Sequence, residues 1–266
     1  MKKWQYTPAS DLDQSMAGRL RMFPREPDML VYGLRSLGAV LIRAALRMYH
    51  RFEILGAENL PGSRSFILVA NHSSHLDTVC LLAALPFQKL HRAFPAAAED
   101  YFFRSVPRLW IASVVVNALP FARNIQARHS ITVCHQLLAN PGNILIIFPE
   151  GTRSTTGEVS EFRSGIGALV AGKDVPVLPC YLDGAHRAWP KGRRLPRPHK
   201  VRLVIGPPRD YSIWENDKTS VTAIANELRE AVIQLGTRND ICRTHDEELG
   251  RPRAVLSFVD PKKSDG

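Results

Sequence analysis

The chain has 266 residues, with 35 lysines and arginines against 25 aspartates and glutamates, and a formal net charge of +10. Apolar residues make up 45% and charged residues 23%, which excludes wholesale disorder and a polytopic membrane protein. A single domain of this length buries a sizeable core without metals or disulfides. The basic excess predicts an anionic partner, such as phosphate, an acidic carrier protein, anionic lipid or nucleic acid.

The cysteine pattern and the N-terminus indicate a reducing compartment. No cysteine pair has the spacing of a metal knuckle or a redox motif, and the four residues are Cys80, Cys134, Cys180 and Cys242. Lys2 and Lys3 are followed by polar residues where a signal peptide needs an apolar segment. The longest uncharged run, 129–149, is broken by polar residues, Pro and Gly, so we expect no transmembrane helix.

The first 50 residues divide into two segments. Residues 1–28 are polar and predict a flexible leader. Apolar residues then recur at helical spacing over 29–50, interrupted by Arg35, Arg43 and Arg47. Two interpretations of this amphipathic helix are equally open. It packs on the domain core, or it is a membrane-contact helix whose arginines lie among lipid headgroups.

From residue 51 onward, predicted strands and helices alternate. The strands are expected at 52–55, 65–70, 143–148, 175–181 and 200–205. The helices are expected at 76–85, 106–114, 127–139, 164–172 and 219–236. This alternation of apolar strands and helices predicts an α/β fold with a largely parallel central sheet flanked by helices. We expect one domain over 51–236 and a polar, frayed C-terminal tail over 237–266.

The first candidate site follows the predicted strand 65–70 and contains His72 and Asp77. In open α/β sheets, ligands gather at the carboxyl ends of the strands, and His72 stands where a strand ends and a helix begins. Side chains five residues apart do not share a face of a regular helix, but a strand–turn–helix junction can bring them together. Asp77 would then accept a hydrogen bond from one nitrogen of His72 and leave the other free as a general base.

Two other interpretations of this segment stay open. Ser74 and Asp77 have the spacing of a capping box, in which Asp77 would serve only the start of the helix. His72, His75 and Asp77 also have the chemistry of metal ligands, but two histidines and one acid are too few for a closed site. We therefore expect no metal and a solvent-facing His75.

The second candidate site follows the predicted strand 143–148 and reads Pro-Glu-Gly-Thr-Arg-Ser over 149–154. Gly151 allows a close backbone approach to a ligand, and Arg153 offers a planar fork that suits phosphate. Alone, the pattern is also typical of an ordinary charged loop, but it ends a second central strand, as His72 does. Arg123 by itself has the features of a solvated surface arginine. Pro179 lies in an apolar segment that is typical of a core or edge strand.

These segments together resemble the lysophosphatidate and glycerol-phosphate acyltransferase family. The first and third family blocks are similar to His72-Ser-Ser-His-Leu-Asp77 and Phe148-Pro-Glu-Gly-Thr-Arg-Ser154. Phe121-Ala-Arg123 is similar to the end of the second family block, and residues 175–179 are similar to the fourth block. A His-x4-Asp pair alone is a weak signal, but all four blocks occur in family order, which makes the resemblance specific.

The resemblance implies a reaction and a set of roles. His72 would deprotonate the free hydroxyl of a lysophospholipid, which would attack the acyl thioester of coenzyme A or acyl carrier protein, and Asp77 would orient His72. The acceptor's glycerol and phosphate would be held by Arg123, Glu150, Gly151, Thr152 and Arg153. Pro179 would shape the acyl or acceptor pocket. The favoured acceptor is 1-acylglycerol-3-phosphate, which gives phosphatidic acid, and the family needs no cofactor or metal.

The expected enzyme is a peripheral protein at the cytoplasmic face of the membrane, because the arginines of 29–50 disfavour an anchored one. One rival function is acyl transfer to another lyso-lipid, such as a lyso-aminolipid. Another is a non-catalytic cationic membrane-surface protein. Nucleic acid is not an expected partner, because the chain carries no recognised binding motif. A serine hydrolase is disfavoured because no Gly-x-Ser-x-Gly elbow occurs in the chain.

Overall fold

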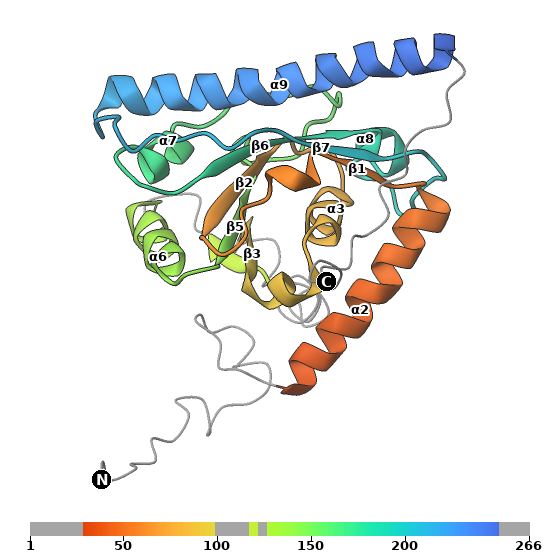
Figure 1. Cartoon of the computed structure of the whole chain (residues 1–266), viewed down its shortest axis with the longest axis horizontal. Coiled ribbons are helices and arrows are strands. Elements are labelled where there is room, and N and C mark those ends of the chain that lie inside the picture. The colour runs from red at the N-terminus through yellow and green to blue at the C-terminus, as the bar shows by residue number, and fades with distance from the viewer. Residues whose placement is uncertain (1–28, 99–116, 122–126, 250–266) are drawn as a thin grey trace, which may run out of the picture.

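The structure is a computed structural model that describes residues 29–98, 117–121 and 127–249 (Figure 1). Within these ranges one seven-stranded sheet has the order β1-β7-β6-β2-β5-β3-β4. Its strands are β1 Glu53–Leu55, β2 Phe66–Ala70, β3 Ala93–Ala98, β4 Leu119–Phe121, β5 Ile144–Ile147, β6 Val177–Asp183 and β7 Arg202–Ile205. All neighbouring strands are parallel except β6 and β7. The predicted α/β fold with a largely parallel sheet is confirmed.

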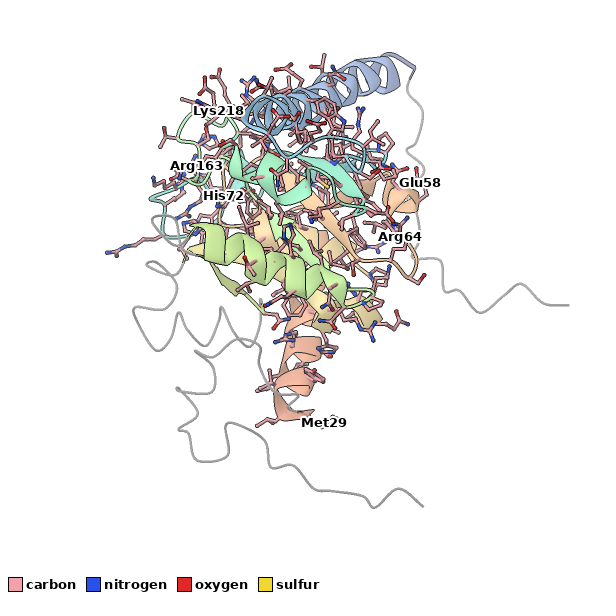
Figure 2. The ribbon with its side chains drawn as sticks, turned by 90° about the vertical axis from the view of Figure 1, so that its left-hand side faces the viewer. Met29, Glu58, Arg64, His72, Arg163 and Lys218 are labelled. Atoms are coloured by element: carbon pink, nitrogen blue, oxygen red, sulfur yellow. The ribbon has the colours of Figure 1, made fainter. Side chains whose placement is uncertain are left out.

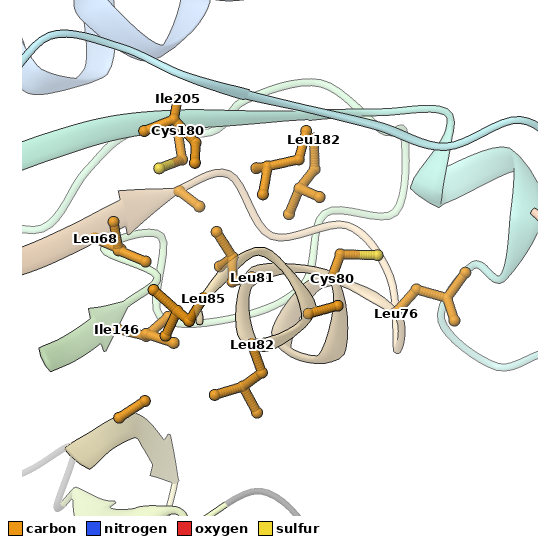
Figure 3. Close-up of a cluster of buried hydrophobic side chains, with 14 of the residues drawn as sticks. Leu68, Leu76, Cys80, Leu81, Leu82, Leu85, Ile146, Cys180, Leu182 and Ile205 are labelled. Carbon is orange, nitrogen blue, oxygen red and sulfur yellow. The ribbon is translucent and has the colours of Figure 1, made fainter. Parts of the chain in front are cut away.

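Helices cover both faces of the sheet, as Figure 1 shows. They are α2 Met29–Tyr49, α3 Asp77–Ala84, α6 Ala127–Ala139, α7 Gly165–Val170, α8 Ala185–Ala188 and α9 Lys218–Leu249, with short 3-10 turns η1 Ala57–Asn59 and η2 Phe87–Arg92. Because side chains alternate along a strand, β2 contributes Leu68 to one core and Val69 to the other. The first core lies under α2, α3 and α8 (Figure 3), and the second under α6, α7 and α9.

Several elements differ from the sequence prediction. Strand β3 was not predicted, because its Ala-Phe-Pro-Ala-Ala-Ala sequence is poor in β-branched residues and contains a proline. Strand β4 and helix α8 are too short to carry a periodic pattern. Helix α9 continues beyond residue 236 to Leu249, into the segment predicted as a frayed tail. The leader 1–28, the predicted helix 106–114 and Arg123 lie outside the described residues.

Helix α2 turns two of its arginines toward the protein. Arg35 is buried and donates from Nη2 to Asn117 Oδ1 at 3.1 Å. The Arg43 guanidinium lies 3.7 Å from the Phe87 ring centroid and donates to the Leu85 carbonyl. Burial lowers the pKa of Arg35 to about 10, which still leaves it charged near neutrality. The interpretation in which all three arginines lie among lipid headgroups therefore does not hold for Arg35 and Arg43.

The outward face of α2 is apolar. Its exposed large apolar and aromatic side chains are Met29, Leu30, Leu34, Leu37, Val40, Leu41, Met48 and Tyr49. Arg47, the third arginine of the helix, is also exposed. By length and composition, α2 also meets the requirement for a membrane span, a test that core helices of soluble proteins and signal sequences pass as well. The expectation that no segment is long and apolar enough to span a membrane is therefore wrong. That expectation rests on uninterrupted uncharged runs, and arginines interrupt the apolar sequence of α2.

The antiparallel pairing of β7 decides what lies at the edge of the sheet where β2, β5 and β6 end. Because β7 runs against β6, its amino end, at Arg202, lies beside Asp183 at the carboxyl end of β6. Strand β1 is parallel to β7, so its first residue Glu53 also lies at this edge. Helix α2 directly precedes β1, and its C-terminal end therefore reaches the edge that carries His72.

Candidate active site

The carboxyl end of β2 leads into a loop that is held by its own polar side chains. The buried amide of Asn71 accepts the Leu182 N–H at 2.8 Å and donates to the Leu182 carbonyl at 3.2 Å. The side chain thereby continues the pairing of β2 with β6 after the backbone of β2 has turned away. This contact sets the point from which His72, the next residue, leaves the sheet.

His72 and Asp77 contact each other as the strand–turn–helix spacing predicts. His72 Nδ1 lies 2.8 Å from Asp77 Oδ2, and the Asp77 side chain is 0% exposed. The same Oδ2 accepts the backbone N–H groups of Ser73 at 2.7 Å and Ser74 at 2.8 Å. The two interpretations of Asp77 are therefore compatible, because one carboxylate binds the imidazole and also the backbone N–H groups of the turn that precedes α3. The predicted capping box is formed only in part, because no side chain caps the first residue of α3 itself.

The other nitrogen of His72 is left available for chemistry. With Nδ1–H donating to the Asp77 carboxylate, Nε2 carries the lone pair, and it makes no hydrogen bond to the residues that the structure describes. The His72 side chain is 22% exposed, and its ring stacks on the Phe148 ring with the centroids 4.2 Å apart. A histidine held in one tautomer and open on its other nitrogen is suited to general-base catalysis.

The loop after β5 binds the backbone of His72, in addition to the contact of Asp77 with its side chain. The Glu150 carboxylate is 5% exposed, and its Oε1 accepts the His72 N–H at 2.6 Å. Its Oε2 accepts the Ser160 N–H at 3.1 Å, and the Ser154 N–H donates to the His72 carbonyl at 2.7 Å. Both oxygens of Glu150 thus bind backbone groups of the protein. The backbone contacts of Ser154 with His72 and of Ser160 with Glu150 were not predicted, because long-range backbone contacts leave no pattern in the sequence.

Gly151 and Thr152 follow Glu150 and differ in their surroundings. Gly151 has a φ of 72°, and an added Cβ would come within 2.6 Å of Arg163 Nε, so the position requires glycine. The close approach is therefore to an arginine of the same chain. The Thr152 side chain is exposed. A contact of either residue with the acceptor stays a prediction.

Arg153 lies against His75 in the first loop. Its Nη1 is 2.7 Å from Nδ1 and 2.6 Å from Nε2 of the His75 ring. Burial, and then the Arg153 charge, lower the pKa of His75, so the imidazole is neutral near pH 7 and can accept from the arginine. The His75 ring also lies 5.0 Å from that of Trp189. The expectation of a solvent-facing His75 is therefore wrong.

Pro179 is buried inside β6, where it pairs with Val69 of β2. Its carbonyl accepts the Gly206 N–H at 2.8 Å, whereas the ladder between β6 and β7 begins one residue later at Cys180. The missing N–H of the proline therefore falls just outside that ladder, which explains how a central strand tolerates it. A role of Pro179 in shaping a pocket stays a prediction.

The arrangement at this edge would suit the activation of a hydroxyl by a histidine base. Within the described ranges, no group of three or more His, Cys, Asp or Glu residues could hold a metal ion. The sequence profile of the Acyltransferase family matches residues 51–183, and the chain belongs to this family. It is therefore an acyltransferase, and His72, Asp77 and the 148–154 loop all lie within the matched region.

Relatives of known name support the assignment. The chain is 24% identical over 208 residues to 1-acyl-sn-glycerol-3-phosphate acyltransferase alpha of Mus musculus, covering 77% of this chain and 70% of that protein. It is 30% identical over 165 residues to the chloroplastic 1-acyl-sn-glycerol-3-phosphate acyltransferase LPAT1 of Arabidopsis thaliana, covering 60% and 44%. The crystal structure of the 1-acyl-sn-glycerophosphate acyltransferase PlsC of Thermotoga maritima matches with a TM-score of 0.58 and 27% identity, covering 77% and 80%.

Proposed function

We propose that the protein transfers a fatty acyl chain from an acyl thioester to the free hydroxyl of 1-acyl-sn-glycerol-3-phosphate, giving phosphatidic acid and a free thiol. The observation that carries the proposal is the His72–Asp77 pair with an available Nε2. The relatives are named for acyl transfer to this acceptor, and their names support the choice of substrate. A thioester already contains a good leaving group, so the protein has to supply a base and alignment.

The proposed chemistry follows from the tautomer of His72. Nε2 removes the proton from the acceptor hydroxyl as its oxygen attacks the thioester carbon, and the Asp77 carboxylate stabilises the imidazolium that forms. The tetrahedral intermediate then expels the thiolate, which takes the proton back from His72. The C–S bond is thereby exchanged for a C–O ester bond, and no acyl-enzyme forms.

We further propose that Arg123 and Arg153 bind the phosphate of the acceptor and that Gly151 and Thr152 contribute to the same site. Glu150 contributes to it indirectly, because both of its oxygens bind backbone N–H groups and hold the His72 backbone. An arginine fork suits a phosphate. Arg153 contacts His75, which belongs to the same loop as His72. The reaction uses no cofactor or metal, with acyl-CoA or acyl carrier protein as the co-substrate. EDTA should therefore leave turnover unchanged, whereas loss of activity that added metal restores would contradict this part.

We also propose that the enzyme binds the cytoplasmic face of the membrane as a peripheral protein through 29–50. Both acceptor and product are lipids, and the apolar outward face of α2 offers a surface that can lie in the interface. Alkaline carbonate should release the protein from membranes. A need for detergent would indicate instead that α2 spans the bilayer, for which it is long and apolar enough.

The decisive experiment supplies purified protein with a labelled acyl thioester and a panel of lysolipids that differ in headgroup. We expect labelled phosphatidic acid from the lysophosphatidate sample and little product from the others. Preference for a different headgroup would leave the acyltransferase but change its acceptor. Lipid binding without transfer to any acceptor would contradict the proposed substrate class.

A further inference from the structure

A basic loop, defined as residues 187–197, begins in the last residues of α8 and is not used by the proposed chemistry. No aspartate or glutamate occurs between 184 and 200, whereas basic residues are frequent there: Arg187, Lys191, Arg193, Arg194, Arg197 and Lys200. Among the described residues, no carboxylate forms an ion pair with those of 187–197. Leu195, in the middle of the loop, is 74% exposed. The loop therefore presents uncompensated positive charge around an exposed apolar side chain.

The basic loop has a defined backbone conformation. The Trp189 Nε1–H donates to the Arg193 carbonyl at 2.8 Å, and the Arg197 N–H donates to the Ala188 carbonyl at 2.8 Å. These bonds join the start and the end of the loop. Because the backbone is already ordered, a ligand of the arginines would not have to order it on binding.

The basic loop lies at the catalytic edge of the sheet. It follows the carboxyl end of β6, which is the parallel neighbour of β2. The Ser74 hydroxyl, in the loop that carries His72, donates to the Trp189 carbonyl at 2.8 Å. The loop that precedes α3 and the basic loop are therefore in direct contact.

The opposite end of the basic loop contacts the end of α2. The Tyr49 hydroxyl donates to the Pro196 carbonyl at 3.3 Å, and His50 Nδ1 lies 3.2 Å from the His199 carbonyl. Met48, next to this contact, is 77% exposed. Figure 1 shows α8 close to the C-terminal end of α2. The apolar face of α2 and the basic loop thus adjoin at the edge that carries His72.

We propose that the basic loop, 187–197, is a second membrane-contact segment, which binds anionic phospholipid headgroups and holds the catalytic edge against the bilayer. An exposed leucine between arginines suits an interface in which the apolar side chain inserts and the cations meet phosphates. Continuity with the apolar face of α2 favours a lipid surface over an acidic carrier protein. The inference rests on the proposed function, because a bilayer-resident acceptor is the reason for docking.

The test compares the double variant Arg194→Ser/Arg197→Ser with Lys173→Ser/Lys218→Ser, which removes the same charge elsewhere. Lys173 and Lys218 are exposed; Lys173 follows α7 and Lys218 begins α9. These helices cover the face of the sheet opposite to α2 and α8, and Figure 2 shows Lys218 far from Met29 of α2. Full-length protein is sedimented with phosphatidylcholine vesicles that contain or lack phosphatidylglycerol. A basic residue near an anionic surface contributes a factor of about five, so the loop variant should bind the anionic vesicles about 25-fold more weakly. The control should change little.

A third variant, Leu195→Ser, tests insertion. In high salt, where charge contributions are screened, it should lower vesicle binding severalfold. Equal binding of the loop and control double variants would overturn the proposal. So would a loop variant that binds vesicles normally but loses turnover with carrier-protein thioester and not with acyl-CoA, since the loop would then dock the carrier. Vesicle binding is measured without turnover, so a wild-type protein that docks but transfers no acyl group would contradict the proposed function alone.

Discussion

Two loops at neighbouring strand ends each contribute a buried carboxylate to His72, and they hold different parts of it. Asp77, in the loop after β2, binds the imidazole and two backbone N–H groups of its own turn. Glu150, after β5, binds the backbone N–H of His72 and that of Ser160. The first carboxylate sets the tautomer of the imidazole, and the second sets the position of the His72 backbone. Similar acids at one edge of a sheet can therefore serve chemistry and support separately.

His72→Ala is the largest expected effect, because it removes the group that both loops hold. Loss of a general base lowers the rate by about 10²–10⁴-fold. The residue is partly exposed, so the melting temperature should change little. Steady-state turnover with a matched melting curve checks this. Near-normal turnover by a folded variant would remove His72 from the mechanism.

Asp77→Asn separates orientation from capping. If Asp77 sets the tautomer, the rate falls by up to the whole base contribution, about 10²–10⁴-fold. The matched control is Ser74→Ala, which keeps the carboxylate. It removes the hydroxyl that accepts the Leu76 N–H at 3.1 Å and donates to the Trp189 carbonyl at 2.8 Å. A lost capping bond costs about 1 kcal/mol of stability. If the two variants lose similar stability and neither loses rate, Asp77 serves only the helix start.

Arg153→Ala tests whether the second loop also binds substrate. A charge-assisted contact with phosphate contributes about 1.5–3 kcal/mol, so the KM for lysophosphatidate should rise about 10–150-fold with a smaller change in kcat. Arg153→Lys should rescue this only in part, because the fork geometry is lost. Kinetics with each substrate varied in turn provide the check. A rise in the KM of the acyl donor alone would assign Arg153 to the coenzyme or carrier.

Glu150→Gln should give the smallest effect on rate and a clear effect on stability. The glutamine keeps one acceptor oxygen but points an NH2 group at the N–H of His72 or Ser160. An unsatisfied buried group costs about 1–3 kcal/mol, measured by denaturant unfolding. We expect kcat to fall severalfold while the acceptor KM stays near wild type. The reverse pattern, a raised acceptor KM with unchanged kcat, would assign Glu150 to acceptor binding.

Features that depend on neighbours along the chain were determined by the sequence itself. Alternating apolar strands and helices predicted the α/β fold, because burial on both faces of a parallel sheet requires continuous apolar strands. The spacing of His72 and Asp77 predicted their hydrogen bond, because a single turn separates them. The family blocks identified the reaction class for the same reason, since each is a short local segment.

Contacts between distant segments were decided by the tertiary structure. The order of the strands and the reversal of β7 bring α2 and the basic loop to the catalytic edge, and no local pattern encodes either. Glu150 meets the backbone of His72 only because β5 and β2 are paired. Arg35 and Arg43 of α2 face inward, against the hydrophobic pattern, because Asn117 and Phe87 of η2 supply partners for them. Apolar strands of similar length can pair in many orders, so the order depends on how the whole core packs.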